Sequence, residues 1–574
     1  MEKRKIILAV VILFNVLFFI QAKDKKVIYL NDYLNTEQPN SDAMPAIRAA
    51  LEQCILNKAS TLVLPGGRLY IKRDQAFEKY QFISNNNESL KRIAFDLAGM
   101  EDFTIEGNNT ELMFSGFISP FNLEECRNVT INNLTIDYTR TFNSEGIIVN
   151  KGEGWLDIKF PEDYMYDIDN GTLRFKDENH VYYPYSNLLE FDSKLREPAF
   201  QAKDFWLWSP VAAEEIEKGT VRIKRDDLKG TIGNTLVFGA SARYNPAFTL
   251  NTCEDINIYN VNLYHCGGMG VIAQSSEDIE LRKVNVTPTP GSNRMISITA
   301  DATHFVNCSG YIRMIDCIFE NQKDDASNIH GWYMAVESVK DDYTMLLRWK
   351  NTGQYGVDFI TPHSTLEFVD NETMSTYDRA KVKSVKRLNK EYLEVVMSTL
   401  LPKEIKKNHV VAADDAYPEV LIKGCRIQKN RARGLLLGSR ARMVIEDNYF
   451  HTPGAAILFE GDGNYWYEQS GVRDVIIRNN IFENCNYGSE DWGRACIAVG
   501  SGIPNKEVSR YHHNIRVEKN IFKTYDPRIL YLYSVDGFIF KNNTIEKTNA
   551  YLYTRSENRP FVVTDSSNVE ITEK

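Results

Sequence analysis

The sequence predicts an all-β protein: a right-handed parallel β-helix with two inserted β-barrel-like domains and an N-terminal capping helix. Three observations predict this fold. A six-residue unit that begins and ends with an apolar residue recurs along the chain, several consecutive units start 23 residues apart, and no long segment has the period of an amphipathic helix. Helical repeats are longer than this period, so it favours stacked coils of short β-strands.

The repeat unit is clearest near the C-terminus, where it reads I-R-N-N-I-F from Ile477 and F-K-N-N-T-I from Phe540. The nine units begin at Ile131, Ile258, Leu281, Met314, Ile422, Ile445, Ile477, Val517 and Phe540. Asn is expected at the coil corners because it tolerates left-handed backbone angles and forms local hydrogen bonds. The steps from 131 to 258 and from 314 to 422 exceed 100 residues, so both must contain insertions.

The N-terminus is typical of a secretory signal peptide, which we expect to span residues 1–22. Lys3, Arg4 and Lys5 precede an apolar run over residues 6–20, and Ala22 offers a small residue at the cleavage point. An uncleaved membrane anchor is the alternative, but the run is short for a span of about 20 residues. Export to the periplasm, the cell surface or the medium of a bacterium is therefore expected, with no membrane span after cleavage.

The mature chain divides into β-helix segments and insertions. We expect these boundaries: 23–144 for the N-terminal cap and first coils, 145–245 for the first insertion, 246–332 for central coils, 333–415 for the second insertion, and 416–574 for the C-terminal coils. Residues 42–57 have the pattern of a short amphipathic helix, which would cover the open end of the β-helix. The strand-rich insertions are expected to shape the substrate entrance or to form an oligomer contact, such as that of a homodimer.

Charge and cysteine content exclude several classes of protein. The formal net charge is −10 and no long run of Lys or Arg occurs, which argues against a nucleic-acid partner. The nine cysteines are an odd number and lack C-x-x-C spacing. They are interpreted as small buried apolar residues rather than as a disulfide framework or a metal site, and no cofactor is expected.

The segments that follow neighbouring repeat units bring three carboxylates to one face. T-A-D-A-T-H-F-V and N-Q-K-D-D-A-S-N-I-H-G place Asp301, Asp324 and Asp325 there, and Asp301 precedes Asp324 by 23 residues, one coil. Glycoside hydrolysis needs one protonated and one ionised carboxyl group, and clustered like charges push pKa values apart. An inverting enzyme usually holds the two groups about 6.5–9.5 Å apart, a distance that stacked coils with splayed side chains can provide.

Other polar and aromatic residues are expected at the same face. Binding of sugar hydroxyls, or stacking on a sugar ring, is expected from His304, His330, Arg294, Arg433, Glu460, Asn464 and Trp466, with Arg431 and Trp492 as further candidates. Three alternatives stay open. The aspartates satisfy turn amides or bind calcium; the chain is a pectin-type hydrolase or lyase, although few basic residues are present for a uronate; or the β-helix binds glycans without catalysis.

The site segments also carry a family resemblance. T-A-D-A-T-H-F, K-D-D-A-S-N-I-H-G, N-R-A-R-G-L-L-L and I-L-F-E-G-D-G-N-Y-W-Y-E together resemble glycoside hydrolase family 110, over nearly the whole mature chain. The resemblance implies an exo-acting, inverting α-1,3-galactosidase that needs no metal. Its glycan substrate would end in α-1,3-linked galactose, in branched blood-group-B structures or in linear ones.

The resemblance also implies roles for the aspartates. The family pattern falls on Asp301, Asp324 and Asp325 as the catalytic cluster. A looser similarity to the polygalacturonases of family 28 makes Asp324 the general acid, with Asp301 and Asp325 holding the attacking water. The G-H-G motif of family 28 is missing, which argues against a polygalacturonase.

Overall fold

The computed structural model describes residues 26–35, 37, 41–500 and 502–573. The predicted signal peptide lies outside these residues. Among them, no helix is both long and apolar enough to cross a membrane.

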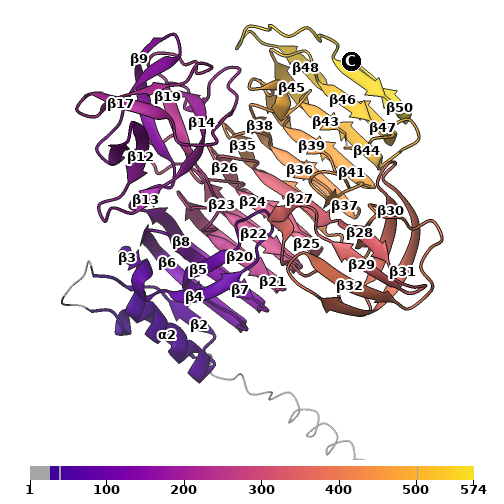
Figure 1. Ribbon diagram of the computed structural model, residues 1–574, viewed down its shortest axis with the longest axis horizontal. Coiled ribbons are helices and arrows are strands. Elements are labelled where there is room, and N and C mark those ends of the chain that lie inside the picture. Colours follow the sequence, from indigo (N-terminus) through magenta and orange to yellow (C-terminus); the bar gives the residue numbers. More distant parts are fainter. Residues whose placement is uncertain (1–25, 36, 38–40, 501, 574) are drawn as a thin grey trace, which may run out of the picture.

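The body of the molecule is a parallel β-helix (Figure 1). One long sheet contains the repeat units, in β8 (Arg127–Tyr138), β21 (Glu254–Leu263), β23 (Glu277–Val286), β25 (Ser309–Ile315), β34 (Glu419–Lys423), β37 (Arg442–Glu446), β41 (Asp474–Arg478), β44 (His512–Glu518) and β47 (Val535–Lys541). The first residues of all nine predicted units are paired in register from strand to strand. The repeat therefore predicted both the fold and its register.

The middle of each unit forms a coil corner. The third residue has a positive φ in every unit: Asn133, Asn260, Lys283, Asp316, Gly424, Asp447, Asn479, Lys519 and Asn542. This left-handed conformation explains the Asn, Asp and Gly at that position, because these residues adopt it most readily. The fourth residue is buried and points into the coil: Leu134, Val261, Val284, Cys317, Cys425, Asn448, Asn480, Asn520 and Asn543.

Four of these inward residues form a buried ladder of asparagines. The side-chain oxygen of Asn480 accepts from the backbone and side-chain amides of Asn448, both at 3.0 Å. The Asn480 side chain in turn donates to the carbonyl of Ile445 at 2.9 Å and to the side-chain oxygen of Asn520 at 3.0 Å. Asn520 repeats the pattern with Asn543. The ladder pairs the backbone groups that the corner leaves without strand partners.

Removing one rung should be costly. We expect Asn480→Ala to lower the free energy of unfolding by about 2–4 kcal/mol, because it leaves the Asn448 amides and the Ile445 carbonyl buried without partners. Denaturant unfolding monitored by circular dichroism measures this loss. The neighbouring exposed corner residue provides the control, since Asn479→Gly keeps the left-handed corner. Equal stability of the two variants would contradict a structural role for the ladder.

A helix covers the N-terminal end of the β-helix, as predicted. α2 (Met44–Asn57) buries Met44, Ile47, Leu51 and Cys54 against the first coils. Asp42 stands just before the helix, and its carboxylate accepts from the Met44 amide at 3.0 Å. The apolar edge of the first coil is thereby removed from solvent.

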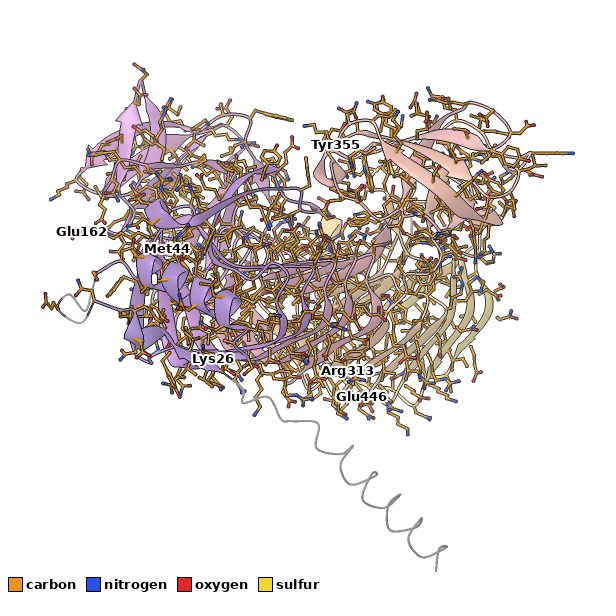
Figure 2. The ribbon with its side chains drawn as sticks, turned by 90° about the horizontal axis from the view of Figure 1, so that it is seen from below. Lys26, Met44, Glu162, Arg313, Tyr355 and Glu446 are labelled. Carbon is orange, nitrogen blue, oxygen red and sulfur yellow. The ribbon has the colours of Figure 1, made fainter. Side chains whose placement is uncertain are left out.

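Both insertions are antiparallel β-domains, and both rise from the same side of the β-helix (Figure 2). The first contains an 11-stranded sheet from β9 (Ser144–Gly152) to β19 (Thr235–Ala240). The second is a closed six-stranded barrel from β28 (Met334–Val339) to β33 (Val410–Ala413). Since β8 still pairs with β21, the first insertion leaves the stacking of coils undisturbed.

All nine cysteines are buried and unpaired. Several stand at coil corners beside other cysteines, where they fill space between stacked coils. The interpretation of these residues as small apolar core residues is confirmed.

Candidate active site

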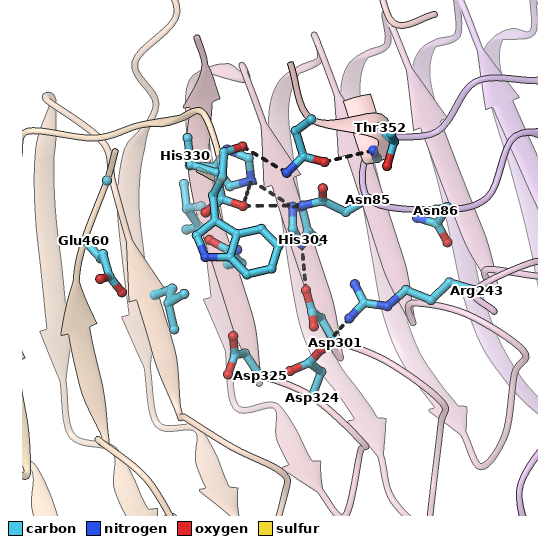
Figure 3. A pocket seen from close by; sticks show the side chains of 18 of the residues that line it. Asn85, Asn86, Arg243, Asp301, His304, Asp324, Asp325, His330, Thr352 and Glu460 are labelled. Carbon is cyan, nitrogen blue, oxygen red and sulfur yellow. Dashed lines mark hydrogen bonds and ion pairs between the residues drawn. The ribbon is translucent and has the colours of Figure 1, made fainter. Parts of the chain in front are cut away.

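A cavity of about 620 Å³ opens on the side of the β-helix that faces the inserted domains. Its floor comes from a second parallel sheet, at strands β24 (Thr303–Val306), β27 (Ser327–Trp332) and β36 (Leu435–Leu437). Its walls come from residues 85–88, from the barrel loop 351–355 and from residues 460–468. Distant parts of the chain thus surround one patch of the floor (Figure 3).

The three predicted aspartates lie together on this floor. Asp301 stands two residues before β24 and Asp325 two residues before β27, and the first residues of these strands are partners in the parallel sheet. Asp301 is therefore level with Asp325, whereas the 23-residue step had suggested Asp324. One side-chain oxygen of each aspartate lies within 4.8 Å of one oxygen of each of the other two, so the three carboxyl groups form a single cluster.

Arginines hold two of the three carboxylates. Nη1 of Arg431 lies 2.6 Å from Oδ1 of Asp324, and Arg243 binds the other oxygen of Asp324. Arg433 forms a two-pronged ion pair with Asp325, with contacts of 2.9 and 3.0 Å. Arg431 and Arg433 come from the turn before β36, and Arg243 follows the last strand of the first inserted domain. Both oxygens of Asp324 and both of Asp325 accept charged hydrogen bonds, which stabilise their ionised forms.

The third carboxylate is bound to two histidines instead. Oδ2 of Asp301 lies 2.6 Å from Nδ1 of His304, whose Nε2 lies 2.9 Å from Nε2 of His330. Nδ1 of His330 donates to the carbonyl of Gly331 at 2.8 Å. All three side chains are buried, and Figure 3 shows His304 between Asp301 and His330.

The surroundings raise the pKa of two of the three carboxyl groups and lower that of the third. Burial and the neighbouring charge of Asp324 raise the pKa of Asp301 to about 7. Burial also raises the pKa of Asp325 to about 7, although Arg433 opposes the rise. Burial disfavours the ionised form of Asp324 too, but its arginines outweigh this and hold its pKa below the usual value. A general acid must be protonated when substrate binds, and among the three groups Asp324 is the one whose pKa is lowered.

Most other predicted site residues reach the cavity. His304, His330, Arg433, Glu460 and Trp466 line it, and burial raises the pKa of Glu460. The indole of Trp466 is about half exposed, at 53%. It is therefore free to stack on a sugar ring.

Two predicted residues do not line the cavity, and this corrects the sequence-based expectation. Nη1 of Arg294 is 2.6 Å from the buried carboxylate of Asp137, and its Nη2 donates to the Tyr138 carbonyl at 3.0 Å. Arg294 thus fastens the loop before Asp301 to the first coils. Asn464 exchanges hydrogen bonds with Asn371 of the barrel. The further candidate Trp492 is also absent from the cavity lining. It packs near Arg431, whose Cζ lies 5.7 Å from the centre of the Trp492 ring.

Sequence reasoning missed the cavity walls. Residues 85–88, Arg243, the loop 351–355 and Glu468 lie outside the repeat, so no period points to them. A buried lysine connects two of these parts: Nζ of Lys91 donates to the carbonyls of Asn87 at 2.9 Å and Tyr244 at 2.7 Å. Burial lowers the pKa of Lys91 to about 8.

The spacing of the aspartate oxygens is small enough for a cation, but their hydrogen-bond partners do not suit one. Calcium takes six to eight oxygen ligands. Here four carboxylate oxygens already face guanidinium groups and a fifth faces an imidazole. The positive charges that would compensate the cluster are therefore supplied by the chain itself.

Activity should accordingly be independent of divalent cations. We expect dialysis against EDTA to leave kcat unchanged, and added calcium to leave the melting temperature unchanged, because the arginines already neutralise the cluster. Turnover measured before and after dialysis provides the test. Loss of activity that calcium restores would place a metal among the aspartates.

Comparison with known proteins gives matches along the chain. Residues 144–236 match the family model for GLAA-B beta-barrel domain I, and residues 344–411 match GLAA-B beta-barrel domain II. Residues 408–573 match the model for a right handed beta helix region. The two barrel models fall on the two inserted domains.

Curated relatives are similar to this chain over 92% of its length. Alpha-1,3-galactosidase A of Shewanella woodyi is 35% identical over 538 residues, which cover 92% of this chain and 88% of that protein. Alpha-1,3-galactosidase B of Bacteroides thetaiotaomicron is 30% identical, with 92% and 87% covered. Alpha-1,3-galactosidase A of Bacteroides fragilis is 31% identical, with 92% and 89% covered.

Proposed function

Because this chain belongs to the α-1,3-galactosidase family, glycoside hydrolase family 110, we propose that it is an exo-acting, inverting enzyme that releases terminal α-1,3-linked galactose. The observation that carries this proposal is the aspartate cluster, in which Asp324 is held ionised and Asp301 has a raised pKa. A glycosidase needs this combination of an ionised and a protonated carboxyl group. Blood-group-B structures and linear α-1,3-galactosides are the proposed substrates.

Exo action is supported by the shape of the site. The aspartates lie on the floor of a cavity with walls on several sides, formed by residues 85–88, 351–355 and 460–468. Such walls suit the end of a glycan chain better than its middle, because an internal sugar needs an open groove on both sides. Trp466 and Glu460 would contact the terminal sugar by stacking and by hydrogen bonds. The predicted signal peptide supports action on glycans outside the cytoplasm.

We assign the roles within the cluster from its hydrogen bonds. Asp301 donates its proton to the glycosidic oxygen as the bond from that oxygen to the anomeric carbon breaks. A water molecule attacks the anomeric carbon from the opposite face, and Asp324 accepts the proton that this water loses. Asp325, fixed by Arg433, would orient the same water. This order reverses the assignment of Asp324 as the acid.

The proposal is tested by galactose release from the branched B trisaccharide and from linear α-1,3-galactobiose, followed by NMR of the anomeric proton. We expect β-galactose as the first product, because single displacement inverts the anomeric centre. The ratio of the two rates defines the preferred substrate. Initial α-galactose would contradict inversion, and release of no galactose from either glycan would contradict the proposed substrate.

A further inference from the structure

The histidines beside the cluster suggest how its proton is held. We propose that His304 and His330 are positioning residues that keep Asp301 protonated: while both imidazoles are neutral, the chain of hydrogen bonds from Gly331 to Asp301 is complete only when Asp301 carries its proton. The inference rests on the proposed role of Asp301 as proton donor. It concerns the resting protein, so it is also testable without substrate.

The argument begins at the far end of the chain of hydrogen bonds. The Gly331 carbonyl can only accept, so Nδ1 of His330 carries a hydrogen and donates it at 2.8 Å. A neutral His330 then has a bare Nε2, which accepts from Nε2 of His304 at 2.9 Å. A neutral His304 consequently has a bare Nδ1. The atom that faces this lone pair at 2.6 Å is Oδ2 of Asp301, and only a protonated carboxyl group can donate there.

The same conclusion follows from a count of hydrogens. The three hydrogen bonds from Asp301 through His304 and His330 to Gly331 need three hydrogens. Two neutral imidazoles supply two of them. If Asp301 were ionised and both histidines neutral, only two hydrogens would be available for the three contacts. In one of the contacts two lone pairs would then face each other with no hydrogen between them. Ionisation of Asp301 therefore has a cost that this chain of hydrogen bonds imposes.

The alternative distributions place the third proton on an imidazole, either His304 or His330, beside an ionised Asp301. Burial and His330 hold the pKa of His304 well below its usual value, which disfavours the first of these. The charged and titratable groups that face the three side chains are Asp324, Asp325, Arg243, Arg433 and Glu468. Of these, Glu468 lies 3.6 Å from Nε2 of His330.

Asp301 also differs from Asp324 and Asp325 in the hydrogen bonds that its second carboxyl oxygen, Oδ1, accepts. Among the described residues, none donates a hydrogen bond to Oδ1 of Asp301, whereas both oxygens of Asp324 and of Asp325 accept from arginines. Asp301 is therefore the aspartate whose partners favour the neutral form. Arginines thus pair with two of the carboxyl groups, whereas the hydrogen-bond partner of the third, Asp301, favours its neutral form.

The pH dependence of kcat/KM on α-1,3-galactobiose tests this inference. In the wild type we expect activity to fall as the pH rises through about 7, where Asp301 loses its proton. His304→Leu removes the acceptor of that proton, so the fall should move to lower pH by about one unit, with about a fivefold loss of kcat/KM at pH 7. His330→Leu should move it in the same direction. A shift to higher pH, or no shift, would overturn the inference, because a His304 that donates to an ionised Asp301 predicts the opposite sign.

Two further variants separate this effect from loss of structure. His330→Gln offers a side-chain oxygen to Nε2 of His304, so it should restore most of the wild-type pH profile. His513→Gln, in β44, changes a histidine outside the cavity and should leave the profile unmoved. A His330→Gln profile that matches His330→Leu would contradict the proposed chain of hydrogen bonds.

Nitrogen-15 NMR of imidazole-labelled protein gives an answer that does not need turnover. We expect hydrogen on Nε2 of His304 and on Nδ1 of His330 at pH 6, with signals assigned from the His304→Leu and His330→Leu variants. Hydrogen on Nδ1 of His304 would overturn the inference. If these tautomers are observed but neither glycan is cleaved, the proposed function fails while the proton chain stands.

Discussion

Asp301→Asn should lower kcat on α-1,3-galactobiose by about 10²–10⁴-fold, the usual contribution of a general acid. The amide keeps the shape of the side chain but has no acidic proton for the glycosidic oxygen. An aryl α-galactoside with an activated leaving group needs little protonation, so its hydrolysis should fall far less. Steady-state kinetics on the two substrates measure the difference.

The matched variant is Asp324→Asn, which lies in the same cluster and changes charge by the same amount. We expect it to slow both substrates alike, because attack by water is required whatever the leaving group. If Asp324→Asn instead retained activity on the aryl galactoside and Asp301→Asn did not, Asp324 would be the acid. The assignment from family-28 similarity would then be restored.

Arg440→Leu should destabilise the protein by about 3–5 kcal/mol, because it leaves a buried carboxylate without its charged partner. Arg440 stands between β36 and β37, and both its terminal nitrogens lie 2.8 Å from the oxygens of Glu367 in β30 (Thr365–Asp370). Glu367 is fully buried. This ion pair connects the inserted barrel to the β-helix, so its loss should also loosen the barrel loop of the cavity. Urea unfolding followed by tryptophan fluorescence measures the change.

The double variant Arg440→Leu/Glu367→Leu is the control for this ion pair. Removal of both charges leaves no unpaired ion, so much of the lost stability should return. A similar loss in the double variant and in Arg440→Leu would show that the cost comes from packing rather than from the stranded charge.

The sequence was sufficient for the fold because the same two physical demands recur in every coil. A corner needs a residue that tolerates a left-handed backbone, and the next residue must point inward. Those two demands leave a visible pattern from Ile131 to Phe540. The aspartate cluster was also predictable, since Asp301, Asp324 and Asp325 follow repeat units that stack.

The remaining parts of the site depend on partners that no period reveals. Arg243 comes from the end of an insertion, and its place beside Asp324 is set by how that domain packs. Arg294 looked available for substrate, yet a buried carboxylate at Asp137 binds it. The roles of the aspartates likewise depend on which of them meets arginine and which meets histidine, and that is a property of the assembled coils.

The placement of Arg243 has a consequence for how such an enzyme can change its specificity. The first insertion could be exchanged without disturbing the pairing of β8 with β21, because the chain leaves and re-enters the β-helix at the same level. The exchange would nevertheless remove a counter-charge from Asp324. Replacing the first insertion would therefore change both the cavity entrance and the pKa values of the aspartates. Substrate range and pH optimum would then vary together among proteins that share these coils.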